Sequence, residues 1–314
     1  MSEFDLIYRY FSNQFPQRSD VELGIGDDAA ICNVPSNMQL VTSIDTLVAG
    51  VHFPLTTKPE DIGYKALAVN LSDVAAMGAT PVWMTLALTC PEVDATWLQK
   101  FSQGLLELAQ IHQVSLIGGD TTRGSLTVTI QIAGLIPLNT AIKRSGAKPG
   151  DNIYVTGTLG DAGLGLAIVN QQINSSKSAH KYLLSRLNRP TPRLQEGQSL
   201  RGIAHSAIDI SDGLIADLGH ILDASNVGAS LYVNDLPLST ALSESSSYET
   251  ALNLALSAGD DYELCFTTPN TMNSYTCIGK IETDQGLRCL TKEGNIFIPK
   301  TTGYQHFYNN SSLR

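Results

Sequence analysis

The segment Gly24-Ile25-Gly26-Asp27-Asp28-Ala29-Ala30 is the first of several short clusters that combine glycine with aspartate. Related clusters follow along the chain: SIDT at 43–46, GGDTTRG at 118–124, DISDGL at 209–214 and GDDYEL at 259–264. Ionised aspartates beside a polyphosphate repel it by an energy on the order of several kcal/mol, so divalent cations have to lie between them. Mg²⁺ suits this position because it prefers oxygen ligands and bridges carboxylates to phosphates. The series therefore indicates a magnesium-dependent phosphate site.

Length and composition favour two compact domains. The chain has 314 residues, more than a single hydrophobic core usually supports, so we expect two domains of roughly 150 residues each. Apolar residues make up 43% of the chain and charged residues only 16%, below the share of roughly 25% that is typical of globular proteins. Both domains can therefore bury a core.

Charge and cysteine content exclude several classes of partner. The net charge of -10, without a cluster of Lys and Arg, argues against nucleic-acid binding. The five cysteines form no CxxC pair, so neither a disulfide framework nor a zinc ribbon is indicated. No apolar run approaches the ~20 residues of a membrane-spanning helix, and the N-terminus lacks a basic leader. We therefore expect no membrane contact and a cytoplasmic location.

The order of the expected elements predicts an α/β or α+β fold with mixed sheets flanked by helices. Strand and helix patterns alternate in the first half, with strands at 29–34, 39–45, 82–90, 114–117 and 125–136 and helices at 58–77 and 94–112. The segment 137–150 ends in Pro149-Gly150 and is the expected inter-domain connection. We therefore expect one domain over residues 1–140 and another over residues 141–314.

Acids of the first half stand where a ligand can bind. Asp27 and Asp28 follow two glycines, although adjacent acids are also common in plain turns. Asp45 ends the strand LVTSID, and the two-residue period of a strand places Ser43 on the same face. Asp73 borders the apolar stripe of a predicted helix, where a carboxylate needs a partner or a metal unless it lies on a solvated flank.

The cluster GGDTTRG follows the apolar strand expected at 114–117. Its two glycines can offer amides while Asp120 reaches a cation and Arg123 a phosphate, and a plain hairpin turn is the alternative. The cluster DISDG precedes a helical pattern. Ser211 or Asp212 can cap that helix, and the helix start can also bind phosphate through its free amides.

Other nucleotide-binding motifs are absent from the sequence, which has no GxxxxGK[ST] loop, no GxGxxG fingerprint and no HRD/DFG set. GTLGDAGLG at 157–165 is only loosely similar to a phosphate loop, and a helix start packed against a strand explains it equally well. His52 taken alone is expected to be a surface or packing residue unless the fold brings it to the acids.

Together and in order, these motifs resemble the thiamine-monophosphate kinase family of the aminoimidazole ribonucleotide synthetase-like superfamily. The resemblance spans nearly the whole chain and is carried by GIGDDAA, SIDTLVAGVHF, KALAVNLSDVAAMGA, LIGGDTTRG, RSGAKPGD, VTGTLGDAGLGL, DISDGL, GDDYEL and the closing GYQHF. It implies that superfamily's two-domain fold. It also implies an N-terminal domain that binds metal and nucleotide and forms a homodimer, and a C-terminal α/β domain that completes the active site.

The resemblance also assigns roles to single residues. It implies that several Mg²⁺ ions are bound by Asp28, Ser43, the Ile44 carbonyl, Asp45, Asp73, Asp120, Asp209 and Asp212. It implies that ATP contacts Gly119, Asp120, Arg144 and Ser211, and that thiamine monophosphate contacts His52, Glu263 and Tyr304. Arg144, Asp45 and Asp120 would take part in catalysis. Ser102 departs from the family, because many members have Tyr at this position.

The implied reaction is ATP-dependent phosphorylation of thiamine monophosphate to thiamine diphosphate by direct in-line transfer. The acceptor phosphate has a second pKa of about 6, so it needs no general base at neutral pH. Catalysis then consists of alignment and charge neutralisation by Mg²⁺ and Arg144. The cationic thiazolium ring would suit Glu263 and the aromatic face of Tyr304.

Three alternatives stay open. Other ATP-using members of the superfamily share the fold, although the reactive Cys and Lys of selenophosphate synthetases have no counterpart before Cys32 and Lys58. A two-metal phosphohydrolase would use the same carboxylates to activate water. A non-enzymatic nucleotide sensor would bind Mg-ATP without turnover.

Overall fold

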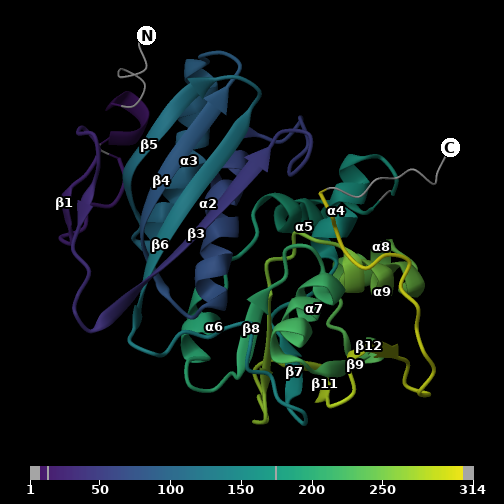
Figure 1. The fold of residues 1–314 in the computed structure, drawn as a ribbon. Helices are drawn as coiled ribbons and strands as arrows, with labels where there is room; N and C mark the ends of the chain where they lie inside the picture. The colour runs from purple at the N-terminus through teal and green to yellow at the C-terminus, as the bar shows by residue number, and fades with distance from the viewer. Residues whose placement is uncertain (1–7, 13, 174, 307–314) are drawn as a thin grey trace. The chain divides into compact units, whose positions relative to one another are not determined.

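The computed structural model describes residues 8–12, 14–173 and 175–306, which form two compact units (Figure 1). The first unit contains the described residues up to Lys143 together with Asn188–Ile203. The second unit contains Arg144–Leu187 and the described residues from Ala204 onward. The first unit is therefore built from two separate parts of the sequence.

The main sheet of the first unit has the strand order β3-β6-β4-β5 within the described residues. These strands span Met38–Val48 (β3), Thr127–Pro137 (β6), Thr80–Cys90 (β4) and Ser115–Arg123 (β5). β4 and β5 are parallel because helix α3 (Ala95–His112) connects them, whereas β6 pairs antiparallel with both of its neighbours. The sheet is therefore mixed, as the sequence predicted.

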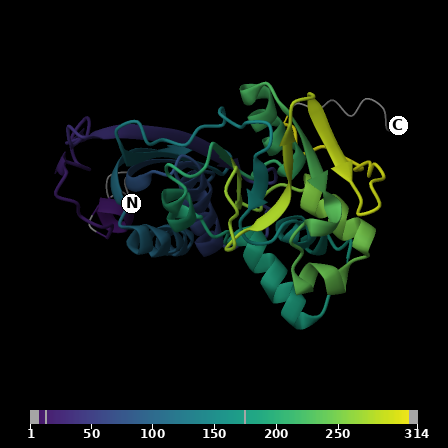
Figure 2. The ribbon, with the colours of Figure 1, turned by 90° about the horizontal axis from the view of Figure 1, so that it is seen from below.

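Helices α2 (Pro59–Ala76) and α3 cover one face of this sheet (Figures 1 and 2). Leu67, Leu71 and Val74 recur at helical spacing in α2 and are fully buried. A short pair of strands, β1 (Val21–Leu23) and β2 (Ile31–Cys32), supplies apolar side chains that pack at one end of the sheet, next to Trp83. A π-helical turn spans Tyr8–Ser12.

The second part of the first unit, residues 188–203, is fixed to the rest of that unit by Arg189 and by helix α6 (Leu194–Ser199). The Arg189 guanidinium donates to Asp61 at 2.7 Å and to both carboxylate oxygens of Glu107 at 3.0 and 2.9 Å. The same group lies 4.6 Å from the ring centroid of Tyr64, in cation-π geometry. These contacts explain why residues 188–203 belong to the first unit.

The sheet of the second unit has the order β12-β9-β11-β7-β10-β8 within the described residues. Its strands span Asn152–Val155 (β7), Ser206–Asp209 (β8), Gly228–Tyr232 (β9), Leu264–Thr268 (β10), Thr276–Glu282 (β11) and Gly286–Leu290 (β12). The remaining elements of this unit span Asp161–Val169 (α4), Lys177–Asn188 (α5), Leu214–Ser225 (α7), Val233–Asp235 (η2), Thr240–Ser245 (α8) and Tyr248–Ser257 (α9). The strands and α7 enclose the larger core of the unit, which includes Ile208, Leu218 and Ile278.

Candidate active site

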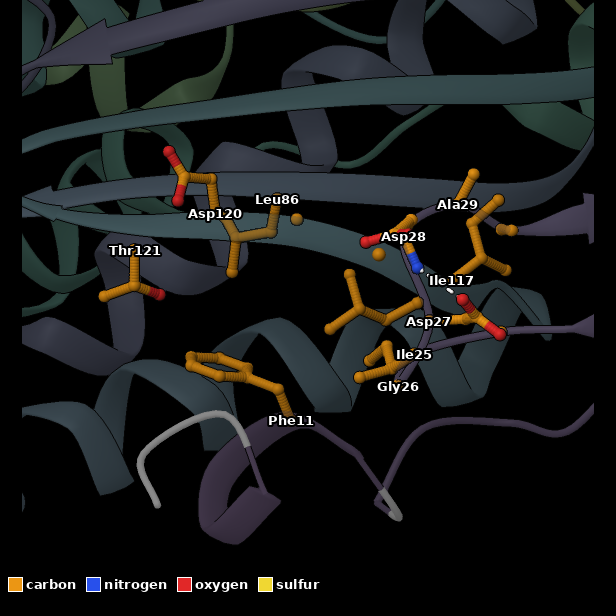
Figure 3. A pocket seen from close by; sticks show the side chains of 15 residues that line it. Phe11, Ile25, Gly26, Asp27, Asp28, Ala29, Leu86, Ile117, Asp120 and Thr121 are labelled. Carbon is orange, nitrogen blue, oxygen red and sulfur yellow. Dashed lines mark hydrogen bonds between the residues drawn. The ribbon is translucent and has the colours of Figure 1, made fainter. Parts of the chain in front are cut away.

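A cavity of about 480 Å³, here called the first cavity, lies beside β5 in the first unit (Figure 3). It is lined by Gly24–Ala30 and Leu116–Thr121, with Phe11 and Leu86. Its volume falls in the range of roughly 300–1,000 Å³ that is usual for small-molecule pockets. The fold therefore brings the first Gly-Asp cluster and the GGD cluster to one cavity, where Asp27, Asp28 and Asp120 all contribute to the lining.

Strand β5 continues through the GGD cluster. Gly118, Gly119 and Asp120 pair in parallel with residues 85–87 of β4, so the alternative of a plain hairpin turn is wrong. A Cβ at Gly119 would lie 2.0 Å from the Leu86 carbonyl oxygen, so only glycine fits at this position. The close approach of the two strands is the physical reason for that glycine.

Ser43, Asp45 and Asp73 gather on the face of the sheet that α2 covers. The Ser43 hydroxyl donates to a carboxylate oxygen of Asp73 at 2.5 Å. The alternating burial of β3 puts Asp45 on the same face as Ser43, as the two-residue period predicted. Asp73 is half-buried and bonded, so the alternative of a solvated flank is wrong for this residue.

Asp45 and Asp120 lie on opposite faces of one sheet. The strand register aligns Asp120 with Ala87, Thr129 and Thr46, and the Thr46 and Thr129 hydroxyls bond at 2.9 Å on that face. Asp45 precedes Thr46 and so points to the other face, toward α2. Three strand spacings separate β3 from β5, which amounts to about 14 Å. These two acids cannot bind the same cation within one chain.

The oxygen donors are of the type that Mg²⁺ binds, but they lie in two separate clusters. Among residues 8–12, 14–173 and 175–306, no three His, Cys, Asp or Glu side chains are arranged to hold a metal ion. The first group is Ser43, Asp45 and Asp73, and the second is Asp28 with Asp120 at the first cavity. Carboxylate and hydroxyl oxygens are the hard ligands that Mg²⁺ prefers. Each group has oxygen donors for only part of a coordination shell.

His52 is half-buried, and its ring is oriented by the backbone. Its Nδ1 accepts the Val48 N–H at 3.0 Å, so the neutral ring carries its proton on Nε2. The carbonyl of His52 accepts a hydrogen bond at 3.2 Å from Lys65, which is only 1% exposed. In that tautomer the donor of the ring is Nε2–H.

The start of α7 differs from the capping interpretation. The N-cap is Gly213, without a side-chain cap, so capping by Ser211 or Asp212 is wrong. The amides of residues 211, 212 and 213 donate to Oδ2 of Asp217 at 3.0, 3.0 and 3.1 Å. A carboxylate from the same helix thus occupies the amides of the loop before α7, whereas the amides of its first turn, from Leu214 on, are not among them, so the phosphate interpretation stays a prediction.

A second cavity of about 610 Å³ lies in the second unit, between α7 and residues 302–306. It is lined by Asp212, His220, Asp223, Tyr304 and His306, together with small residues of α7. The Tyr304 N–H donates to the Asp212 carbonyl at 2.9 Å, which fixes the final described segment to the DISDG loop. The fold thus brings two predicted site residues, Asp212 and Tyr304, to one cavity.

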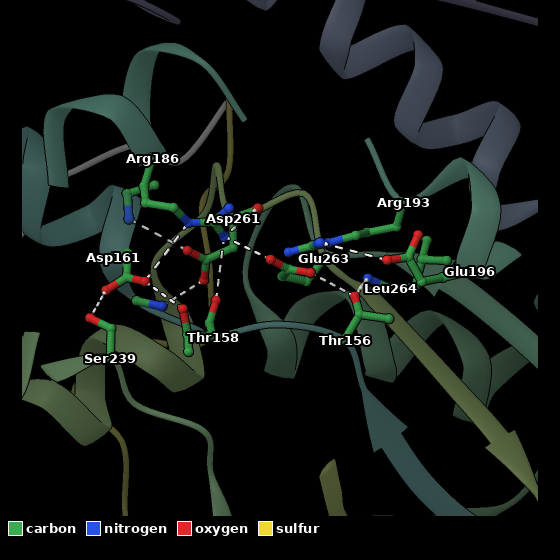
Figure 4. A network of polar contacts seen from close by, with 12 residues as sticks. Thr156, Thr158, Asp161, Arg186, Arg193, Glu196, Ser239, Asp261, Glu263 and Leu264 are labelled. Atoms are coloured by element: carbon green, nitrogen blue, oxygen red, sulfur yellow. Dashed lines mark hydrogen bonds and ion pairs between the residues drawn. The ribbon is translucent and has the colours of Figure 1, made fainter. Parts of the chain in front are cut away.

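Glu263 lies inside the second unit rather than at an open surface (Figure 4). Its side chain is fully buried, and its carboxylate accepts hydrogen bonds from Arg186 at 2.8 Å and from the Thr156 hydroxyl at 2.6 Å. A Cβ at Gly157 would lie 2.2 Å from the same carboxylate. The charge of Glu263 is therefore compensated within the protein.

Arg186 connects Glu263 to two further buried acids. Its guanidinium also donates to the Asp261 carbonyl at 3.2 Å and lies 3.8 Å from Asp161. Asp161 accepts hydrogen bonds from three hydroxyls, those of Ser239, Thr158 and Tyr182. The carboxylate of Asp261 accepts the Gly160 N–H at 2.7 Å. This bond occupies an amide of the GTLGDAGLG segment, in which α4 begins at Asp161.

Burial raises the pKa of Asp261 to about 8 from an ordinary value of 3.8. Between these two values the folded state keeps a proton that the unfolded chain releases, so the free energy of unfolding falls as pH rises, by up to about 1.4 kcal/mol per pH unit. We expect Asp261→Asn, which mimics the protonated acid, to flatten the decline between pH 5 and pH 8 in urea unfolding curves. Equal slopes for the variant and the unmodified chain would contradict the assignment.

Arg144 lies in an exposed loop at the start of the second unit. Ser225 of α7 holds this loop, because its hydroxyl donates to the Arg144 carbonyl at 3.4 Å and accepts the amides of Gly146 and Ala147 at 3.1 and 3.2 Å. The backbone beside Arg144 is thus fixed while its side chain stays exposed.

Sequence reasoning missed Asp217 and Arg186. Asp217 lies on the buried stripe of α7 beside Leu218, and Arg186 lies on the buried side of α5 with Leu183. A charged residue at a core position of an amphipathic helix is the signal that points to such residues, because it needs a buried partner.

Two family models match consecutive parts of the chain. The N-terminal domain of AIR synthase related proteins matches residues 26–136, and the C-terminal domain of these proteins matches residues 148–283.

Among the described residues, no helix combines the length and the apolar character that crossing a membrane requires.

Known proteins match over nearly the full length. Thiamine-monophosphate kinase of Escherichia coli (strain K12) is 51% identical over 319 residues, covering 97% of this chain and 98% of that protein. The crystal structure of thiamine-monophosphate kinase from Stenotrophomonas maltophilia K279a has a TM-score of 0.83 at 46% identity, covering 87% of this chain and 92% of that one. The complex of AaThiL with AMPPCP and TMP has a TM-score of 0.78 at 30% identity, covering 90% and 92%. The chain is therefore an enzyme of the thiamine-monophosphate kinase family.

Proposed function

We propose that this enzyme transfers the terminal phosphate of ATP to thiamine monophosphate, giving ADP and thiamine diphosphate. The observation that carries the proposal is the convergence of Asp28, Gly119 and Asp120 on the first cavity, in a chain with this family's motifs in order. The names of the similar proteins and the ligands of the AaThiL complex support the same substrates.

ATP is proposed to bind at the first cavity. The cavity volume of about 480 Å³ suits a nucleotide. Phe11 and Leu86 provide apolar surface, and the glycines of both clusters let a ligand approach the backbone closely. Arg144 and the Ser211 hydroxyl are proposed as further contacts to the phosphates.

Mg²⁺ is proposed to be held by oxygen donors of the Gly-Asp clusters and of Asp73. These are Asp28, Ser43, the Ile44 carbonyl, Asp45, Asp73, Asp120, Asp209 and Asp212. When bound, the metal supplies neutralisation of phosphate charge. The protein's own part is to orient the donors: Ser43 and Asp73 fix each other through their hydrogen bond, and the bonded ladder of β5 fixes Asp120.

The acceptor is proposed to lie with its cationic ring at the second cavity. Tyr304 offers an aromatic face and Asp223 adds negative charge, which together suit a thiazolium cation. His52 is proposed to donate its Nε2–H to the acceptor phosphate. Glu263 is proposed to support this region from inside rather than to contact substrate, because its carboxylate is buried and paired with Arg186.

The transfer is proposed to be direct and in line. The acceptor phosphate is mostly dianionic at neutral pH, since its second pKa is about 6, and it attacks without a general base. Arg144 is proposed to stabilise the charge on the phosphoryl group as it moves. His52 holds the acceptor oxygen, and no covalent phosphoenzyme is required.

The working enzyme is proposed to be a homodimer. Leu40 and Ile44 are 49% and 63% exposed on the sheet face opposite α2, and no helix of the described residues covers them. Exposed apolar side chains that form a patch on such a face mark an interaction surface. Because Asp45 and Asp120 lie on opposite faces within one chain, we propose that one catalytic site takes Asp45 from one chain and Asp120 from the other.

The proposed activity can be tested by ADP release with three acceptor conditions: thiamine monophosphate, free thiamine and no acceptor. We expect Mg²⁺-dependent release with the monophosphate alone. Release without any acceptor would instead support a two-metal phosphohydrolase, and ATP binding without release would support a sensor or another activity of the superfamily.

A further inference from the structure

Asp217 gathers three successive backbone amides onto one carboxylate oxygen. These amides come from the loop that leads into α7, and the Asp217 side chain is only 3% exposed. The free N–H groups of a helix start usually bind a cap, water or an anion. Here an acid from the first turn of the helix reaches back and accepts the amides of the loop that precedes it.

The other edge of the same loop is held by separate bonds. Three backbone amides from elsewhere in the second unit donate to carbonyls of this loop. The Tyr262 amide donates to the carbonyl of residue 210 at 2.8 Å, the Asp260 amide to that of residue 211 at 2.9 Å, and the Tyr304 amide to that of residue 212 at 2.9 Å. A Cβ at Gly259 would lie 2.3 Å from the Ser211 carbonyl oxygen, so this contact leaves no room for a side chain. Both edges of the loop backbone are therefore fixed, while the side chains of Ser211 and Asp212 stay half-exposed.

We infer that Asp217 is a positioning residue, which aims the side chains of Ser211 and Asp212 at their ligands. The inference rests on the proposed function, which assigns Ser211 to ATP and Asp212 to Mg²⁺. The loop contributes side-chain oxygens to the site instead of backbone amides. The carboxylate oxygens of Asp212 suit a cation, and the Ser211 hydroxyl suits the nucleotide.

Two substitutions of Asp217 distinguish the effect of losing its hydrogen bonds from the effect of losing its charge. Asp217→Ala leaves three converging amides without an acceptor, so the loop is expected to relax and the dissociation constant of Mn²⁺, measured by electron paramagnetic resonance, to rise about 10- to 100-fold. Asp217→Asn keeps an oxygen for the amides, so its Mn²⁺ affinity is expected to stay within a few-fold of the unmodified chain. The Mg²⁺ concentration that gives half-maximal rate should likewise be highest for Asp217→Ala and close to that of the unmodified chain for Asp217→Asn.

Formate gives a readout that does not depend on kinase activity. Its carboxylate fits the position vacated in Asp217→Ala, so formate is expected to raise the melting temperature of this variant and to restore much of its Mn²⁺ affinity. The unmodified chain and Asp217→Asn should not respond. If Asp217→Ala folds poorly, refolding with and without formate provides the same comparison.

Asp94→Ala is the matched control. Asp94 caps α3 in the first unit by accepting the amides of Thr96 and Trp97 at 2.8 and 3.1 Å. Its removal is expected to lower the melting temperature without changing Mn²⁺ affinity. A folded Asp217→Ala with unchanged Mn²⁺ affinity, or one that formate does not rescue, would overturn the inference. If Mn²⁺ and formate respond as expected while the unmodified chain forms no thiamine diphosphate, the inference stands and the proposed function fails.

Discussion

A dimer that pairs an Asp45→Asn chain with an Asp120→Asn chain is expected to recover about half the activity of the unmodified dimer. Each variant alone is expected to lose about 100-fold or more in kcat/KM, because each removes a charged oxygen from the proposed phosphate site. In the mixed dimer, one site keeps both acids and the other lacks both. Recovery therefore requires that the two acids of one site come from different chains.

The physical basis is the geometry of one sheet. Asp45 faces α2, Asp120 faces away from it, and three strand spacings separate their strands. Two affinity tags on co-expressed chains allow the mixed dimer to be isolated, and ADP release with thiamine monophosphate measures its activity.

The control is a chain with both substitutions, paired with an unmodified chain. If the sites are shared, each of the two sites in this dimer lacks one of its two acids, so activity should stay low. If both acids belonged to one chain, this control would keep about half the activity and the first mixed dimer would be inactive. That reversed pattern would contradict the shared site.

Arg186→Met is expected to lower the free energy of unfolding by about 3–5 kcal/mol, because it leaves buried acids without their cation. Glu263 and Asp161 are both fully buried, and Arg186 lies within 2.8 and 3.8 Å of them. Urea unfolding followed by near-ultraviolet circular dichroism measures the effect. Adding Glu263→Gln to Arg186→Met should recover part of the loss, since it removes one of the uncompensated charges.

Arg288→Met is the matched control in the same unit. Arg288 pairs with Glu282, but both side chains are more than 30% exposed, so the expected loss is below about 1 kcal/mol. Similar losses for the Arg186 and Arg288 variants would mean that the buried network does not hold the second unit together.

Local patterns predicted the main elements of the first unit. Helix α2 covers nearly the range expected at 58–77, since proline and glycine mark its ends and the apolar spacing marks its face. The shared face of Ser43 and Asp45 followed from strand periodicity alone. The mixed, two-domain fold followed from the ordered motifs and from the alternation of elements.

Contacts between distant segments of the chain determine features that local sequence patterns did not predict. Glycine and aspartate are poor strand formers, so the end of the strand was placed before Gly118, yet pairing with β4 carries β5 to Arg123. The loop at Ser211 suggested a cap or a phosphate site, and only the folded α7 brings Asp217 to its amides.

The sequence could not distinguish an exposed acid from a buried one. Glu263 stands in a cluster that is similar in pattern to the one at Asp28, yet Glu263 is fully buried whereas Asp28 is exposed. The difference arises because α5 brings Arg186 from a distant part of the sequence to pair with Glu263. Such a pair is visible only in three dimensions.

Phosphorus NMR of the purified enzyme with Mg²⁺, ATP and thiamine monophosphate follows the proposed phosphoryl transfer itself. We expect that the resonances of ADP and thiamine diphosphate grow together, that inorganic phosphate stays at its starting level, and that EDTA stops the reaction. Growth of inorganic phosphate with ADP, at the same rate with and without thiamine monophosphate, would contradict it.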